Sequence, residues 1–348
     1  MNNQREFWEQ MLIRVEGGDP CALLCVVESM GSSPGRTGFK MCVPHSSAMF
    51  GSIGGGSMEH KLVELARTLL AGHVAGSSVR DPAEVRTVAE ETAGSLRSSE
   101  DPAEVVVFPL LKRQIHQADI GKDRSGMICS GEQTVAFFLL SGDENLHMVR
   151  EILASLDNTA SPCDLKMTSV GIRIVPMGRN STDIEVAWSY REPLRAQPRV
   201  AIVGAGHVSL ALSRMMYQLG FRVEIYDDRP WLNTWQANTF AQQRIVVEHA
   251  RIAEHLPDDP ELFVVLASFG YRTDEIALRQ LIRVRYKYLG MLGSTEKVRV
   301  MFEAMRKDGF TDEELARVHA PIGIPIHSRT PEEIALSIAA EMIGVKNA

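Results

Sequence analysis

The residues best placed for chemistry form a glycine-rich loop, Gly204-Ala205-Gly206, which follows the apolar run RVAIV and precedes a predicted helix beginning at His207. The first glycine permits a tight turn, and the second lets the backbone approach a phosphate at the helix N-terminus. Asp227 ends the next apolar run, where a carboxylate can accept a hydrogen bond from a ribose hydroxyl. This order predicts a Rossmann unit that binds a nucleotide, with His207 able to donate to the phosphate.

The loop departs from the usual dinucleotide fingerprint at one position, because Ser209 stands where a third glycine is common. Serine is still small enough to let the helix pack closely on the sheet. Two interpretations therefore stay open. The pocket binds NAD or NADP, or the chain has a Rossmann-like fold whose pocket holds no dinucleotide.

Polar residues also follow two later predicted strands. Ser268 comes after FVVLA, and Lys297 lies in GSTEK after YLGML, with Ser294 as the expected N-cap of the following helix. Open α/β sheets bind ligands at the carboxyl edge of their strands. We therefore expect Ser268 to line a ligand site and Lys297 to reach an anion.

A second set of candidates lies in the first half of the chain, where Gly54, Gly55 and Gly56 join a predicted strand to a predicted helix. Adjacent glycines cost backbone entropy, so they are expected where a turn is strained or a ligand approaches the backbone closely. An anion at this helix start and a strained turn alone both remain possible interpretations. The loop is not a P-loop, because it lacks the Gly-Lys-Ser/Thr ending.

Two cations and a thiol accompany these glycines. Arg36 lies in the loop GSSPGRTG and Lys40 two residues after it, and both could hold a phosphate ester or be ordinary solvated charges. Cys129 lies between glycines in GMICSGEQ and could be reactive or ligate a metal-bound cofactor, although a buried inert cysteine is the more common case. Cys21 and Cys25 lie four apart in a strand-like run, so we expect both in the core.

The elements that must position the second-half residues alternate as βαβ units do. Strands are expected at 199–203, 222–227, 244–247, 262–267 and 287–291, and helices at 207–219 and 273–284. Thr330-Pro331-Glu332-Glu333 has the composition of a helix start and predicts a terminal helix. The pattern predicts a Rossmann-like, doubly wound parallel sheet over residues 198–348.

The first half shows no βαβ rhythm. Phe7, Met11, Leu12 and Val15 have helical spacing. Strands are expected at 21–29, 39–43, 49–53, 105–111 and 134–140, and helices at 57–70 and 144–156. Pro193 and Pro198 favour an extended linker at about 190–197. The predicted class is α/β, with an N-terminal α+β domain over residues 1–190.

Composition limits the possible functions. The chain has 348 residues, 45% of them hydrophobic, and a formal net charge of −7, with the whole acidic excess before Arg195. This balance is typical of a soluble globular protein and argues against a general nucleic-acid binder. No apolar run reaches the length of a membrane span. Five cysteines without a CxxC pair, and an N-terminus without an apolar core, predict a reduced, cytoplasmic protein.

Taken together, the motifs resemble one family, the XdhC/CoxI proteins. GSSPGRTGFKM and GSIGGGSMEHKLVELA resemble its N-terminal signature, and GMICSGEQTVAFF is similar to its Cys-Gly-Gly strand. The C-terminal Rossmann domain of the family resembles GAGHVSLALSRMMYQLGFRVEIYDDRP, YLGMLGSTEKV and PIGIPIHSRTPEEIALSIAAEMI. The chain departs from the family pattern at Ser130-Gly131, at Thr295 and in PIHS.

The resemblance implies an accessory factor of molybdenum hydroxylases such as xanthine dehydrogenase, a cofactor-insertion chaperone rather than a catalyst. It would bind the molybdopterin-type molybdenum cofactor, present it to a cysteine desulfurase for sulfuration, and insert it into the apo-hydroxylase. The phosphate and pterin are expected in a cleft between the domains. The residues expected near them are Arg36, Lys40, Gly54, Gly55, Gly56 and Cys129, with Cys129 toward the metal. A homodimer is left open.

Two other function classes compete with this hypothesis. Gly204, Gly206 and Asp227 would equally serve an NAD(P)-dependent oxidoreductase. The third function class is a structural protein that uses the Rossmann domain only to dock a partner. These classes differ in the ligand that should accompany the purified protein: a pterin with molybdenum, a nicotinamide nucleotide, or neither.

Overall fold

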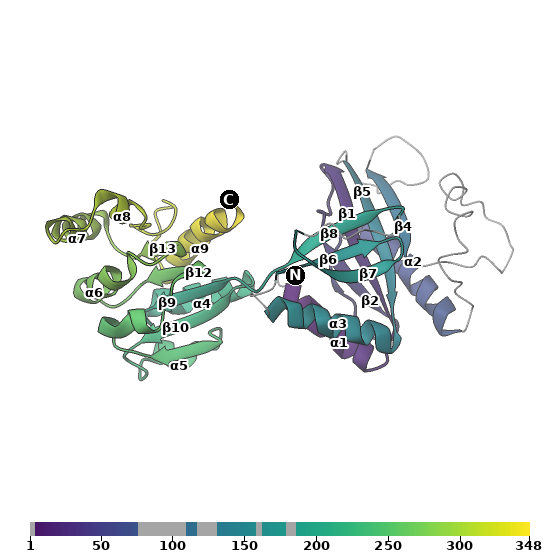
Figure 1. Cartoon of the computed structure of the whole chain (residues 1–348), viewed down its shortest axis with the longest axis horizontal. Coiled ribbons are helices and arrows are strands. Elements are labelled where there is room, and N and C mark those ends of the chain that lie inside the picture. The colour runs from purple at the N-terminus through teal and green to yellow at the C-terminus, as the bar shows by residue number, and fades with distance from the viewer. Residues whose placement is uncertain (1–3, 76–108, 117–130, 158–161, 179–185) are drawn as a thin grey trace. The chain divides into compact units, whose positions relative to one another are not determined.

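The computed structural model describes residues 4–75, 109–116, 131–157, 162–178 and 186–348. The chain divides into two compact units, and the boundary between them along the chain lies between Ala196 and Gln197. Figure 1 shows the helices and strands of both units and labels most of them.

Unit 1 is built on a five-stranded antiparallel sheet in the order β3-β2-β1-β5-β4. A smaller antiparallel sheet has the order β7-β6-β8. The strands are β1 (Cys21–Gly31), β2 (Lys40–Pro44), β3 (Phe50–Gly51), β4 (Leu110–His116), β5 (Gly131–Leu140), β6 (Cys163–Thr168), β7 (Gly171–Pro176) and β8 (Ser189–Leu194). The helices are α1 (Gln4–Glu16), α2 (Gly56–Val74) and α3 (Gly142–Asp157).

The large sheet of unit 1 is covered on both faces along the first half of β1, which explains why residues 21–26 are all apolar and buried. Leu23 and its neighbours two residues away pack into a core with α1, α3 and the small sheet. Leu24 and its alternate neighbours pack against α2. The predicted core positions of Cys21 and Cys25 are confirmed, since both are fully buried. Burial raises the pKa of the Cys25 thiol to about 12, as expected for an inert core cysteine.

Unit 2 confirms the predicted Rossmann-like architecture. Its parallel sheet has the order β11-β10-β9-β12-β13, so the strand order reverses between β9 and β12. The strands are β9 (Arg199–Val203), β10 (Arg222–Asp227), β11 (Gln243–Val246), β12 (Asp259–Leu266) and β13 (Tyr286–Met291). The helices are α4 (His207–Gln218), α5 (Asn233–Ala237), the 3₁₀ helix η2 (His249–Glu254), α6 (Tyr271–Leu281), α7 (Thr295–Lys307), α8 (Asp312–Ala316) and α9 (Pro331–Asn347).

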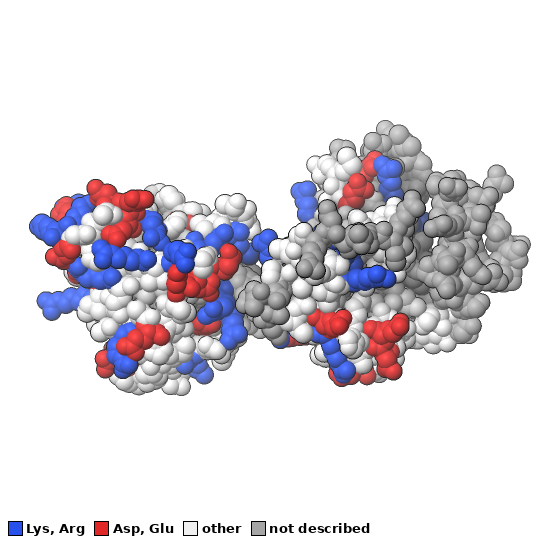
Figure 2. All heavy atoms as spheres, viewed as in Figure 1, with Lys and Arg blue, Asp and Glu red and all other residues white. Residues whose placement is uncertain are grey.

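Helices cover both faces of this sheet, as a doubly wound fold requires. One buried cluster joins alternate strand residues such as Ile202 to α4 and α9. The other joins residues such as Val203 to α6 and α7. On the face drawn in Figure 2, acidic and basic side chains of unit 2 are interspersed, in agreement with its balanced charge.

The predicted helix starts in unit 2 are confirmed by their caps. The Ser294 hydroxyl accepts from the Lys297 amide at the start of α7. At α9, Thr330 and Glu333 form a reciprocal capping box, with Pro331 in the first turn. Among the described residues, no helix has the length and apolar character needed to cross a membrane.

The prediction of a linker at 190–197 is wrong over most of its length. Residues 189–194 form β8, which pairs with β6 along its whole length. Pro193 misled the prediction, because proline is compatible with an edge strand, where one side of the backbone needs no partner. The three strands β6 to β8 were not predicted at all.

Two other strand predictions in unit 1 need correction. The strand predicted at 49–53 is only the two-residue β3. Within the described residues, β4 begins at Leu110 and continues to His116, beyond the predicted end at 111, while residues 105–108 lie outside the described part.

A partly buried carboxylate anchors α9 to the sheet edge of unit 2. Glu341 accepts hydrogen bonds from the Tyr288 hydroxyl at 2.5 Å and the Gly323 amide at 2.8 Å, and its other oxygen lies 3.1 Å from His319 Nδ1. The His319 ring packs against Tyr288 at a tilt of 32°, with 4.4 Å between centroids. Burial alone would raise the pKa of Glu341, but these bonds outweigh it and hold the pKa below its ordinary value of 4.5.

We therefore expect Glu341→Gln to lower the free energy of unfolding of unit 2 by about 2 kcal/mol near pH 7, the usual worth of hydrogen bonds to a charged group. A lowered carboxyl pKa stabilises the fold above the unfolded-state pKa, and this stabilisation is lost as the pH falls through the folded-state pKa. The deficit of the variant should shrink below about pH 4.5. Urea unfolding of the variant and the wild type from pH 7 to pH 3, with hydrogen exchange of α9, measures this difference in stability.

Glu332→Gln is the matched control, because it removes the same charge from an exposed position of α9. A deficit that stays constant down to pH 3, or that Glu332→Gln reproduces, would contradict the assigned role of Glu341.

Candidate functional site

Three glycines of unit 1 let loop backbones approach closely beside the end of β1. A Cβ atom on Gly35 would lie 2.2 Å from the Ile53 carbonyl oxygen, and one on Gly54 would lie 2.5 Å from the Gly35 nitrogen. One on Gly131 would lie 2.6 Å from the Ser33 nitrogen. Gly54 also has φ of 127°, which L-residues rarely adopt. Steric constraints therefore require glycine at position 54, whether or not a ligand is present.

Gln133, which the sequence analysis missed, fastens two of these loops together. Its side-chain oxygen accepts from the Ser33 hydroxyl at 2.7 Å and from the Gly35 amide at 3.0 Å. Its amide nitrogen donates to the Ile53 carbonyl at 3.3 Å. The side chain is 1% exposed, so these bonds are shielded from water. Gln133 therefore fixes the loop at 31–38 against the loop that precedes α2.

Glu59 occupies the amides of the second glycine loop. One of its oxygens accepts from the amides of Ile53 at 2.9 Å and Gly55 at 3.0 Å, and from the Ser52 hydroxyl at 2.7 Å. The negative group that we expected at this loop is thus supplied from the first turn of α2 itself. An external anion would have to displace Glu59 to bind these two amides. Helix α2 has no side-chain cap at Gly55, and Gly56 is its first residue.

Lys40 is also engaged within the protein. Its ammonium lies 2.6 Å from a Glu192 oxygen and 3.0 Å from the Gly38 carbonyl, and both side chains of the ion pair are about nine-tenths buried. The Tyr190 hydroxyl donates to the same Glu192 oxygen. Burial and the neighbouring Glu192 charge raise the pKa of Tyr190. Lys40 therefore ties the loop at 31–38 to β8, and a phosphate could reach it only by competing with Glu192.

Arg36 differs from Lys40 because it lies exposed on the same loop, and no described residue forms a hydrogen bond or ion pair with its side chain. Cys129 lies outside the described residues, two positions before Gly131, so its predicted contact with a metal is untested. Within the described part of the chain, no group of three or more His, Cys, Asp or Glu residues is arranged to hold a metal ion.

In unit 2 the glycine loop lies at the point where the strand order reverses. Gly204 has φ of 116°, and a Cβ atom there would lie 2.3 Å from the Ala267 carbonyl oxygen at the end of β12. Gly206 is the N-cap residue of α4 and provides no side-chain cap, and His207 is exposed at the first helical position. Ser209 is fully buried. The loop thus has the close-packed geometry that its sequence predicted.

Asp227 holds this loop rather than facing solvent. It is fully buried, and one oxygen accepts from the Ala205 amide at 2.7 Å. Arg229 binds both oxygens through its guanidinium, each at 2.8 Å. Burial would raise the pKa of Asp227, but the bonds from Arg229 and Ala205 outweigh it and lower the pKa. A ribose hydroxyl would have to displace one of these partners.

Ser268 and Lys297 are brought together by a residue that the sequence analysis did not select. Asp274 in the first turn of α6 is 1% exposed. One of its oxygens accepts from the Ser268 hydroxyl at 2.5 Å and from the Ser268 amide at 3.0 Å, and the other lies 2.6 Å from the Lys297 ammonium. The two predicted residues therefore do share a site at the carboxyl edge of the sheet, with Asp274 between them.

The newly found residues give only weak signals in the sequence. Gln133 is one polar residue at the start of an apolar strand, and Glu59 and Asp274 look like ordinary acids in the first turn of a helix, where the helix dipole favours them. Their bonds to loops distant in sequence are visible only in the folded chain.

Two family descriptions match the chain in sequence. Residues 14–80 match the XdhC and CoxI family, and residues 200–342 match the XdhC Rossmann domain. The first match contains the two glycine loops of unit 1. The second contains nearly all of unit 2, including Asp227, Asp274 and Lys297.

Among similar proteins, an uncharacterized Escherichia coli protein, YqeB, is 35% identical over 152 residues, which are 43% of this chain and 28% of that protein. A Bacillus subtilis protein described as a probable xanthine dehydrogenase subunit is 26% identical over 150 residues, 43% of each chain. The chain thus matches less than half the length of these relatives.

Among solved structures, a protein described as a xanthine dehydrogenase from Bacillus halodurans has the same fold, with a TM-score of 0.72. The two are 18% identical, and the likeness covers 99% of this chain and 96% of that one.

The position of Gln133 leads to a test of the loop geometry. We expect Gln133→Glu to lower the free energy of unfolding by about 2–3 kcal/mol, because a carboxylate would face the Ile53 carbonyl without a donor in a buried site. Hydrogen exchange of peptides covering 31–38 and 52–55 should accelerate together.

The control is Glu132→Gln on the neighbouring position of β5, where the side chain pairs with the exposed Arg113. It should change stability little, because exposed ion pairs contribute little. Unchanged exchange in both loops of Gln133→Glu would show that Gln133 does not fasten them.

Proposed function

We propose that this chain, which belongs to the XdhC and CoxI family, is an accessory protein in the maturation of a molybdenum hydroxylase such as xanthine dehydrogenase. In this role it binds the molybdopterin-type molybdenum cofactor, supports its sulfuration by a cysteine desulfurase, and inserts it into the apo-hydroxylase. The observation that carries the proposal is the presence of both family domains, in order, on one chain. The B. subtilis relative, by its description as part of a xanthine dehydrogenase, supports the choice of client.

Some of the residues predicted to hold the cofactor phosphate are accessible for that role in the described part of unit 1, and others are already bonded within the protein. The amides of Ile53 and Gly55 are occupied by Glu59, and Lys40 is paired with Glu192. What remains for a phosphate is the exposed Arg36 and the uncapped start of α2 at Gly56. The two belong to one loop cluster, because Gly35 and Gly54 are in backbone contact.

In this proposal the residues of the chain bind and orient the cofactor. Gln133 and Glu59 hold the loops in one shape, so that little loop ordering is needed on binding, which favours affinity. Arg36 offers planar, bidentate donors to a phosphate. The cofactor itself supplies the molybdenum centre that the hydroxylase uses. We propose Cys129 as the chain's ligand toward the metal.

A second candidate function is an NAD(P)-dependent oxidoreductase. It is favoured by the glycine loop at the strand-order reversal of unit 2, where open α/β sheets bind nucleotides. Such an enzyme would show a substrate-dependent absorbance change at the reduced nicotinamide band, whereas an accessory protein would not. A protein that only docks a partner would associate with that partner equally well when both sets of glycine loops are mutated.

The proposed role predicts that the purified chain, mixed with molybdenum cofactor and passed through a desalting column, retains molybdenum and pterin in equal amounts. Arg36→Ala should weaken retention at least tenfold, because a charge-assisted contact to phosphate is lost. Cys129→Ser should release molybdenum more readily than pterin. Metal analysis and pterin fluorescence of the same fractions give both readings.

The control for Arg36→Ala is Arg67→Ala, which removes an exposed arginine of α2 that pairs with Glu64. Retention of neither molybdenum nor pterin by the wild-type chain would overturn the proposal. If Cys129→Ser holds both as tightly as wild type, the proposed metal contact is wrong, while the cofactor-binding role stands.

A further inference from the structure

Three sulfur atoms meet in the core of unit 1, between α1 and the large sheet. The Cys42 thiol of β2 donates a hydrogen bond to the Met11 thioether of α1, with 3.6 Å between the two sulfur atoms. The Cys21 thiol of β1 is a hydrogen-bond neighbour of the same Cys42 thiol. All three side chains are fully buried. Sulfur ligands from three separate elements are therefore gathered in one place.

The strand register makes Cys21 and Cys42 neighbours without making them a disulfide pair. Cys21 lies opposite Pro44 and Cys42 opposite Leu23, so the two cysteines are diagonal neighbours on one face of the sheet. Diagonal residues have Cα atoms about 7–8 Å apart, whereas a disulfide usually needs about 4.4–6.8 Å. Two metal–sulfur bonds of about 2.3 Å each span about 4 Å between sulfur atoms. The spacing therefore suits a shared metal ion better than a sulfur–sulfur bond.

Cys25 is a natural comparison for this arrangement. It is the diagonal neighbour of Cys42 on the other side, and it is equally buried in the same core. Its thiol hydrogen-bonds to the Val26 carbonyl at 3.8 Å, and after burial the neighbours that shift its pKa are Lys40 and Glu192. Cys25 therefore shares the core with the three sulfur atoms but does not belong to their group.

Two thiols and a thioether form a soft set of ligands. Thiolate and thioether sulfur selects monovalent copper among the common metal ions, because soft ligands bind soft cations. Zinc sites draw their ligands from cysteine, histidine and carboxylate side chains rather than from methionine. Met11 as the third ligand therefore favours copper over zinc.

We infer that Met11, Cys21 and Cys42 form a three-sulfur site for one monovalent copper ion. On binding, the two thiols release their protons to water, two thiolate–copper bonds form, and the neutral thioether of Met11 donates a lone pair as the third bond. No electron is transferred, because copper enters as Cu(I). This inference goes beyond the accessory role and does not depend on it.

The surroundings of the site match the charge of such a complex. One Cu(I) and two thiolates carry a net charge of about −1, and Arg14 is the cation whose charge acts on the Cys42 thiol. Its guanidinium lies 5.0 Å from the centroid of the Phe50 ring, and Phe50 pairs with Cys42 in the sheet. Without metal, burial and the hydrogen bond with Cys21 raise the pKa of Cys42, so that this thiol stays neutral in the core.

Helix α1 covers the site and supplies its entry path. It packs on the sheet through Phe7, Trp8, Met11 and Val15, and it is joined to β1 by the short loop 17–20. A surface helix can open locally at a lower free energy than global unfolding requires. Opening of α1 would admit copper to the two cysteines, and closing would add Met11. Bound copper then links α1 to β1 and β2, and hydrogen exchange in α1 should become slower.

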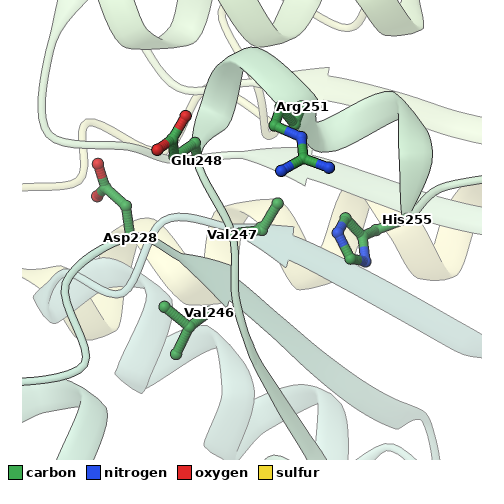
Figure 3. A pocket seen from close by; sticks show the side chains of 6 residues that line it. All are labelled: Asp228, Val246, Val247, Glu248, Arg251 and His255. Atoms are coloured by element: carbon green, nitrogen blue, oxygen red, sulfur yellow. The ribbon is translucent and has the colours of Figure 1, made fainter.

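A second group of metal-binding side chains, in unit 2, provides a control. A cavity of about 450 Å³ is lined by residues that include Asp228, Glu248 and His255 (Figure 3). These are oxygen and nitrogen ligands, and the described residues contain no group of three such side chains arranged to hold a metal ion. Copper bound there would be adventitious. His255→Gln removes the imidazole, the ligand of this group that suits copper best.

The test is anaerobic titration of the full chain with Cu(I) in competition with a chromogenic Cu(I) chelator. We expect the wild type to withhold one copper ion per chain from the chelator. Cys21→Ser and Cys42→Ser should each lower the affinity at least tenfold, because a thiolate ligand is lost. Met11→Leu, which nearly conserves side-chain volume, should lower it at least threefold. Hydrogen exchange of α1 should slow on copper binding in the wild type only.

The matched control is Cys25→Ser, which places the same hydroxyl in the same core and should bind copper like wild type. Melting temperatures of the copper-free variants show whether Cys42→Ser is less stable than Cys25→Ser. His255→Gln should also bind like wild type. The inference is overturned if the wild type withholds no copper, if Met11→Leu and Cys42→Ser keep wild-type affinity, or if Cys25→Ser loses as much affinity as Cys42→Ser. Retention of molybdenum and pterin is a separate measurement, so either proposal can fail alone.

Discussion

The structure of both units depends on how backbone amides in tight glycine loops find acceptors. Glycine lets two loop backbones come into contact, but it offers no side chain to satisfy the amides that this contact removes from water. In unit 1 the acceptors are Gln133 and Glu59, and in unit 2 the acceptor is Asp227. Each comes from an element next to the loop, so the loop and its support fold together.

This constraint divides the charged residues near the loops into two groups. Lys40 and Arg229 neutralise carboxylates that already serve the fold, and Lys297 does the same for Asp274. Removing one partner of such a pair would leave a buried charge, which costs more than the pair contributes. Arg36 in unit 1 forms no such pair with any described residue, so it can bind a ligand without disrupting the loop.

Much of the fold could be predicted from the sequence, because apolar periodicity reports burial along one element at a time. The alternation of strands and helices after Arg199 predicted the doubly wound sheet, and the Thr330 capping box predicted the last helix. The small sheet of unit 1 was missed, since β7 is only partly buried and β8 contains Pro193, so neither has a continuous apolar run. Such strands are stabilised by pairing with β6, and sequence patterns do not show pairing.

The candidate site was predicted less well for a related reason, which the pair Asp227 and Asp228 makes clear. The sequence places an acid at the end of β10, and either residue satisfies the spacing from Gly204. The two aspartates differ in the direction in which their side chains point at the strand end. Asp227 faces the protein, where Arg229 and the Ala205 amide take both its oxygens, and Asp228 is half exposed and lies 3.5 Å from Arg229. A motif thus predicts the type of residue that a loop needs. Only the burial of that residue in the folded chain shows whether it supports the loop or is free to bind a ligand. At this strand end the sequence therefore predicts a carboxylate correctly, and the partners of Asp227 in the folded chain show that this carboxylate serves the loop.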